Sequence, residues 1–200
     1  TAIYGKSTDG NGVEGFSTNY VGVRGSGKAY DFYAGGVGAN YGPFTGAHEV
    51  VLDKNFPINT KSGLIVSTTG KTERRKDQKN AISISSTLPT VQLSFISKDA
   101  SVFGVLVSES PLTKGHWYKA KKEERYGIVN AVGEGRVWVT NINGEIKAGD
   151  LITTSLIAGY GQKQDDDLIH SYTLGKATET IDWSKATEVI EFNGKKYKKY

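Results

Sequence analysis

The sequence predicts an all-β protein in which a Gly-rich, repetitive β stem precedes a compact, β-rich cap domain of short strands and hairpins. Three observations favour this fold class. Glycine supplies 25 of the 200 residues, well above its ordinary share of about 7%. Short runs rich in Val, Ile, Thr and Tyr alternate with turn residues, as strands do. Helical spacing of apolar residues is scarce. We assign residues 1–34 to the stem and residues 35–200 to the cap.

A ten-residue repeat defines the stem. Gly5, Gly15 and Gly25 stand ten residues apart, and each unit follows the pattern G-x-S-T-x-x-x-G-V-x. A unit with one or two apolar side chains cannot bury a core alone, so it must stack on neighbouring units or on other chains. The alternative is a flexible Gly/Ser linker in which the spacing is accidental. Because the sequence opens inside this repeat and lacks methionine, we expect a piece of a longer chain.

An aromatic strand is expected where the stem meets the cap. Residues 29–34 read Ala-Tyr-Asp-Phe-Tyr-Ala, and a Gly-Gly-Val-Gly run follows. In a trimer, the rings of Tyr30, Phe32 and Tyr33 would pack around the axis, whereas a single chain would leave them with too little cover. We therefore predict a trimer contact at these three residues.

Strand signals lengthen from Phe44 onwards. The most continuously apolar segment, residues 101–107, is expected at the centre of the cap's core. Residues 71–80 form a polar loop, and residues 111–125 form an exposed excursion with a helical turn near its end. The other predicted strands lie within residues 44–52, 63–70, 81–85, 91–96 and 126–132.

Short strands and tight turns continue to the end of the sequence. Asn143-Gly144 predicts a hairpin turn after an alternating strand, and Asn193-Gly194 predicts a second hairpin, since this dipeptide accepts positive φ at both turn positions. Gly149-Asp150 indicates a turn, and residues 151–154 a β-branched strand.

Four short motifs follow one another between residues 135 and 179: G-R-V, I-K-x-G-D-x-I-T-T-S, G-Y and L-G-K-A-x-E. Their order resembles the C-terminal domain of phage tail fibres, neck appendages and related tailspike-like proteins. The resemblance spans roughly residues 44–200. It implies a β-rich cap placed after a Gly-rich stem. In some relatives this cap is similar to a self-cleaving intramolecular chaperone that assists trimer assembly.

Composition narrows the possible functions. Without cysteine, neither a disulfide framework nor a thiolate metal site can form. The net charge of +4 is mild, and the basic runs at residues 71–76 and 119–125 are mixed with glutamates, as in solvated loops; a polyanion site is the alternative. We expect no nucleic-acid partner. No apolar run approaches the ~20 residues needed to cross a bilayer, so no membrane insertion is expected.

The sequence carries no recognisable catalytic or cofactor motif. His48, His116 and His170 are not in metal-ligand spacing, and we predict neither a metal nor a cofactor. Asp165, Asp166 and Asp167 are expected in a solvated loop, with a surface calcium site as the alternative. A self-cleavage reaction would need a nucleophile and a base near the stem junction. The residues near that junction that could act as nucleophile or base are Ser26, Lys28, Asp31, His48 and Glu49. We assign a catalytic role to none of them.

These observations favour a structural virion protein over an enzyme. We expect the distal part of a homotrimeric phage tail fibre or appendage, exposed on the virion surface, that contacts other virion proteins and a host-surface glycan or protein. Exposed rings of Trp117, Tyr118 and Tyr160 are candidates for that contact, because aromatic rings stack on sugars; anchoring of their own loops is the alternative. The other hypotheses are a self-cleaving intramolecular chaperone and a cellular surface adhesin or filament subunit.

Overall fold

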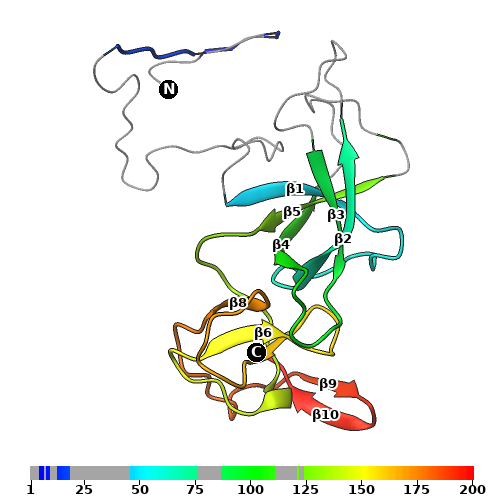
Figure 1. Cartoon of the computed structure of the whole chain (residues 1–200), viewed down its shortest axis with the longest axis vertical. Helices are drawn as coiled ribbons and strands as arrows, with labels where there is room; N and C mark the ends of the chain where they lie inside the picture. Colours follow the sequence, from blue (N-terminus) through cyan, green and yellow to red (C-terminus); the bar gives the residue numbers. More distant parts are fainter. Residues whose placement is uncertain are drawn as a thin grey trace. The chain divides into compact units, whose positions relative to one another are not determined.

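Ten β-strands and one short 3-10 helix make up the secondary structure of the described residues, as seen in a computed structural model (Figure 1). The structure describes residues 5–6, 8–9, 13–18, 46–75, 87–110, 121 and 124–200. No α-helix occurs among these residues, which confirms the all-β class. The chain divides into two units, Thr1–Gly36 and Val37–Tyr200. The predicted trimer contact at Tyr30, Phe32 and Tyr33 lies outside the described residues.

The first five strands close into a barrel in the order β1-β3-β2-β4-β5. Neighbouring strands are antiparallel except β1 and β3, which run parallel with Val51 opposite Thr90. Closure comes from β1 and β5, which pair from Ala47 opposite Asn130 to Leu52 opposite Arg125. The strand bounds are Ala47–Leu52 for β1, Ile65–Arg74 for β2, Thr87–Leu93 for β3, Val102–Ser110 for β4 and Arg125–Asn130 for β5.

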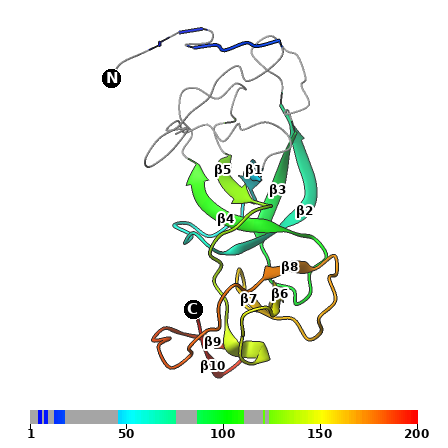
Figure 2. The ribbon, with the colours of Figure 1, turned by 90° about the vertical axis from the view of Figure 1, so that its left-hand side faces the viewer.

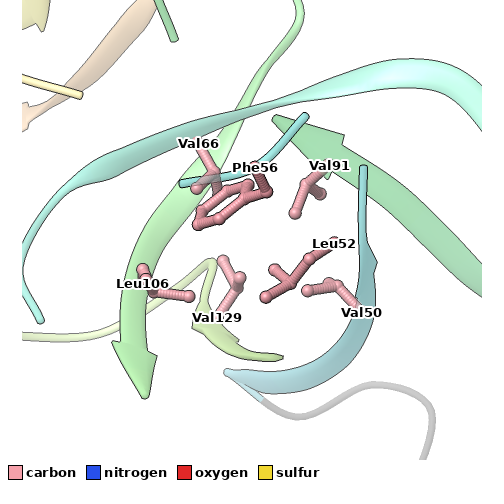
Figure 3. Packing of buried hydrophobic residues seen from close by; sticks show 7 residues of the cluster. All are labelled: Val50, Leu52, Phe56, Val66, Val91, Leu106 and Val129. Atoms are coloured by element: carbon pink, nitrogen blue, oxygen red, sulfur yellow. The ribbon is translucent and has the colours of Figure 1, made fainter. Parts of the chain in front are cut away.

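The barrel interior is filled by branched side chains that alternate along the strands. In β1, Val50 and Leu52 point inward, because side chains two residues apart share a face of a strand. Phe56, from the loop after β1, completes the core (Figure 3). The remaining buried members are Val66, Val91, Leu106 and Val129. Val51 lies in a separate buried cluster with Leu88 and Tyr126.

The prediction that residues 101–107 form the centre of the core is only partly right. The segment does lie in β4, and Leu106 is fully buried, but Val107 is exposed. In a closed barrel each strand has one inward and one outward face, so even a continuously apolar strand contributes every second residue to the interior. Phe103 is half-buried and packs against the core cluster, and Val102 and Val105 are also half-buried.

The C-terminal module, residues 131–200, contains the other five strands and the 3-10 helix η1 (Asn141–Asn143). Strands β6 (Leu151–Thr154), β7 (Gly161–Lys163) and β8 (Thr173–Lys176) form a sheet in the order β7-β6-β8. Strands β9 (Val189–Phe192) and β10 (Lys195–Lys198) form a hairpin. Figure 2 shows this module against one end of the barrel.

One of the two Asn-Gly predictions is confirmed and the other is wrong. Asn193 and Gly194 both have positive φ, at 51° and 72°, and join β9 to β10 as a hairpin turn. Asn143 instead ends the 3-10 helix, where Gly144 N–H bonds to the Asn141 carbonyl at 3.1 Å. The Asn143 amide donates to the Lys163 carbonyl at 2.8 Å, so a tertiary contact determines this turn.

Backbone hydrogen bonds join the barrel to the C-terminal module. Ile65 N–H donates to the Gly159 carbonyl, and Gly159 N–H donates to the Ser94 carbonyl, each at 2.7 Å. A buried cluster of Leu64, Ile157 and Tyr160 fills the junction. No helix within the described residues has the length and apolar character that a membrane crossing requires.

Candidate binding pocket in the C-terminal module

An open pocket with a volume of about 500 Å³ lies beside the three-stranded sheet of the C-terminal module. This volume lies in the range of ordinary ligand sites, about 300–1,000 Å³. The lining comes from the ends of β6, β7 and β8 and from the acidic loop, residues 165–170. The lining residues are Gly149, Asp150, Leu151, Lys163, Gln164, Asp165, Asp166, Asp167, Ile169 and Lys176.

A tight turn holds Asp150 at one side of the pocket. Gly149 has φ of 93°, a conformation that favours glycine, and the predicted turn is confirmed. The Asp150 carboxylate accepts a hydrogen bond from Lys147 N–H at 2.8 Å and pairs with Lys163 Nζ at 3.0 Å. The Lys147 hydrogen bond, with the Lys163 charge, lowers the pKa of Asp150 in spite of partial desolvation. Asp150 is therefore ionised and fixed in position.

Asp165 is fixed from the barrel side. Lys98, in the β3–β4 loop, places its Nζ 2.5 Å from Asp165 Oδ2, and Asn143 Nδ2 donates to Asp165 Oδ1 at 2.5 Å. The Lys98 hydrogen bond contributes most to lowering the pKa of Asp165. It also raises the pKa of Lys98. The acidic loop is thereby attached to the barrel as well as to its own module.

Asp166 organises the rest of the acidic loop. Its Oδ1 accepts hydrogen bonds from Gln164 Nε2 at 2.9 Å and Leu168 N–H at 3.1 Å, and it lies 3.0 Å from His170 Nε2. Desolvation acts to raise the pKa of Asp166, but the three hydrogen bonds together lower it. The His170 ring stacks on Tyr172 with centroids 4.6 Å apart. The Gln164 amide is buried, and its Oε1 accepts from Thr173 Oγ1 at 2.7 Å. This network fixes the loop conformation.

Two charged groups of the pocket remain available to a ligand. Within the described part of the chain, no hydrogen bond or ion pair engages the side chains of Asp167 and Lys176. Ile169 adds an exposed apolar surface at the rim. The pocket thus offers a carboxylate acceptor, an ammonium donor and an apolar edge on a fixed frame, which suits a polar ligand with several hydroxyl or charged groups.

The pocket shows no arrangement for a reaction among the described residues. No Ser, Thr or Lys side chain described here hydrogen-bonds to the ring of His170, and no described group of three His, Cys, Asp or Glu is placed to hold a metal ion. The Asp165–Asp167 run lies in a loop, as predicted, but its first two carboxylates are engaged by protein donors.

The structure corrects the prediction that Tyr160 offers an exposed ring. Only 8% of Tyr160 is exposed, and its ring packs with Leu64 and Ile157 at the junction. Gly159 lies in the turn before β7 and packs against Leu64 at the barrel, and Gly161 is the first residue of β7. A ring that stabilises the junction cannot also stack on a ligand.

The other predicted site residues do not form a second site within the described part of the chain. Trp117, Tyr118 and His116 lie outside the described residues, as do Ser26, Lys28 and Asp31. His48 and Glu49 are neighbours in β1, and the His48 ring makes an edge contact with Phe103 at 6.2 Å.

Sequence reasoning missed Asp99, a buried carboxylate that accepts several hydrogen bonds. Its Oδ2 accepts from Ser67 Oγ at 2.6 Å, and its Oδ1 accepts from Ser101 Oγ at 2.5 Å and from Ser101 N–H at 2.8 Å. Asp99 N–H donates to Thr154 Oγ1 at 2.8 Å. One residue thus connects β2, the β3–β4 loop and the C-terminal module. The Asp-x-Ser pattern was visible in the sequence, but its burial was not.

Comparisons of the chain with models of known protein families, with curated proteins and with solved structures found no match.

Proposed function

We propose that this chain is a structural virion protein, the distal part of a homotrimeric phage tail fibre or appendage, which assists trimer assembly and attaches to the host surface. The repeat and the cap have complementary roles in this proposal. The repetitive stem gives reach and associates with other copies, and the cap presents a rigid binding surface. The side chains of Val13 and Phe16, in the described part of the repeat, are exposed, which supports association because a repeat needs neighbours to bury its apolar residues.

The observation that carries the attachment role is the pre-organised pocket beside the acidic loop. The side chains of Asp150, Asp165 and Asp166 are held by hydrogen bonds before any ligand arrives, and groups on such a fixed frame lose little entropy on binding. Asp167 and Lys176 supply an acceptor and a donor, and the carboxylates of Asp150 and Asp166 supply further acceptors at the walls. A polyhydroxylated ligand, such as a cell-surface glycan, satisfies both kinds of group.

The test is binding of purified bacterial surface polysaccharides to the full chain, first as an immobilised panel and then by titration calorimetry. We expect at least one polysaccharide to bind, and Asp167→Ala and Lys176→Ala each to weaken it about tenfold, equivalent to about 1.4 kcal/mol for a lost polar contact. Lys185→Ala, a solvent-exposed lysine outside the pocket lining, serves as the matched control and should bind normally.

Two results would count against the attachment role. If no polysaccharide in the panel binds, the glycan assignment fails. If one binds with an affinity that both pocket variants retain, attachment occurs elsewhere on the chain.

A further inference from the structure

Two adjoining loops at the junction expose apolar side chains on a rigid backbone. The first is the β3–β4 loop, residues 94–101, and the second is the β6–β7 turn, residues 155–160. Phe95, Ile96 and Leu156 are 51%, 49% and 51% exposed. We call the surface formed by these three residues the apolar ridge. Large apolar groups gathered at one place on a surface commonly mark an interaction site.

The two loops that carry these three residues are adjacent, because backbone hydrogen bonds join them at both ends. Ser94 O accepts from Gly159 N–H at 2.7 Å, and Thr154 O accepts from Lys98 N–H at 3.4 Å. Phe95 and Ile96 lie between these two bonds on the first loop, and Leu156 lies between them on the second. A hydrogen bond from Asp99 N–H to Thr154 Oγ1 at 2.8 Å strengthens the second attachment. The backbone of the ridge is therefore pre-formed, and binding of a partner would cost little conformational entropy there.

The chemistry of the ridge favours an apolar protein partner over a glycan. Two neighbouring hydroxyls already make hydrogen bonds within the protein: Gln162 Nε2 donates to Ser97 Oγ at 3.1 Å, and Ser155 Oγ donates to the Tyr160 carbonyl at 2.9 Å. A sugar stacked on Phe95 would find few groups for its hydroxyls, and unpaired polar groups at an interface cost affinity. An apolar surface of another protein has no such requirement.

Charge at the ridge is compatible with self-association. Its three residues are neutral, and the adjacent Lys98 is neutralised by Asp165, whose Oδ2 is 2.5 Å from Lys98 Nζ. Three copies of this surface can therefore meet around a three-fold axis without like charges facing each other, although the chain as a whole carries a net charge of +4. Val13 and Phe16, two exposed apolar residues of the repeat, would likewise be covered if copies of this chain associate.

We propose that the apolar ridge is a contact surface between copies of this chain, through which the caps join one another. This inference rests on the proposed homotrimer and adds the residues that hold its caps together. Apolar anchors at the centre of an interface carry most of its binding free energy, so removing two of the three should disrupt the contact.

The experiment measures mass by light scattering over a dilution series of the full chain and of the double variant Phe95→Ser/Leu156→Ser. We expect a trimer for the unchanged chain, and dissociation of the variant at a concentration at least tenfold higher. Ile58→Ser, at an equally apolar position that is 79% exposed on the β1–β2 loop, is the matched control and should dissociate as the unchanged chain does. Circular dichroism verifies that each variant is folded, and a single Leu156→Ser variant replaces the double one if that chain does not fold.

The outcomes separate this inference from the proposed function. If both ridge variants remain trimeric, the apolar ridge is not the contact surface, and the proposed homotrimer is unaffected. A monomer at every concentration overturns the homotrimer and the ridge contact together. In that case, ridge-dependent flotation with phosphatidylcholine vesicles would show that a lipid surface is the occupant.

Discussion

Replacing Asp99 by Ala is expected to destabilise the Val37–Tyr200 unit by at least about 3 kcal/mol. Asp99 is 7% exposed and accepts three short hydrogen bonds, from Ser67 Oγ and from the hydroxyl and N–H of Ser101, at 2.5–2.8 Å. A hydrogen bond to a charged group contributes roughly 1.5–3 kcal/mol, and truncating one partner leaves buried donors unpaired. Because the three hydrogen bonds belong to one network, their contributions are not additive, and the expected loss of unfolding free energy is smaller than the sum of the three.

The assay is urea unfolding followed by tryptophan fluorescence, with Asp182→Ala as the matched control. Asp182 forms the same local motif: it accepts from Ser184 N–H at 3.1 Å and from Ser184 Oγ at 2.5 Å. The Asp182 side chain, however, is 50% exposed, so water replaces the lost partner and the expected loss is much smaller. A loss below about 1 kcal/mol for Asp99→Ala, a surface-like value, would refute the reasoning.

The pH dependence gives a second test at the same residue. Burial acts to raise the pKa of Asp99, but the hydrogen bonds from Ser101 and Ser67 outweigh it, and the pKa in the folded chain lies below the ordinary 3.8. The stabilisation is therefore complete above that ordinary value and is lost as the pH falls through the lower, folded-state pKa. Asp99→Asn should remove this part of the acid sensitivity of unfolding, and an unchanged acid profile would contradict the assignment.

Two further predictions concern the junction and the barrel. Gly159→Ala should cost about 2 kcal/mol or more, because Gly159 has φ of 80° and an added Cβ would lie 3.1 Å from Leu64 Cβ. Gly70→Ala is the control, since Gly70 has φ of 77° with no atom within 4 Å of the added Cβ; equal urea midpoints would exclude a packing cost. Burial and the hydrogen bond to Glu124 raise the pKa of Tyr126 to about 12 from 10.0, so its stabilisation is present below pH 10 and is lost as the pH approaches 12. An ultraviolet titration of folded chain should show one late-ionising phenol that Tyr126→Phe removes; ionisation of all phenols near pH 10 would contradict it.

Local patterns predicted the presence of most described strands, because strand alternation and turn chemistry act over a few residues. They did not predict the strand bounds: β2 extends to Arg74, into the predicted loop, and β3 ends at Leu93 and not at Ile96. The all-β class and the Asn193-Gly194 hairpin follow from such patterns. The barrel does not, since its parallel pair of β1 and β3 joins segments about forty residues apart, and nothing local fixes their register. The same limit explains Asn143-Gly144, whose turn depends on a contact between the Asn143 amide and the Lys163 carbonyl.

Burial was the other property that the sequence could not supply. The Asp-x-Ser motif occurs at Asp99 and at Asp182 with nearly the same local hydrogen bonds, yet only Asp99 is buried. Tyr160 stands between two glycines, as an exposed turn residue would, yet its ring is in the junction. In both cases the packing of the C-terminal module on the barrel decides the role. The pocket, by contrast, is formed within the C-terminal module, because its walls come from the ends of β6, β7 and β8 and from the loop that follows β7.

The most direct test of the proposed fibre role is the solution mass of the full 200-residue chain by light scattering, with an intact-mass spectrum of the same sample. The proposal predicts the mass of three uncut chains. Fragments with a new terminus near the stem junction would instead favour the self-cleaving chaperone. A monomer of uncut chains across the whole concentration range would contradict the homotrimer and leave a linker followed by a stand-alone binding domain.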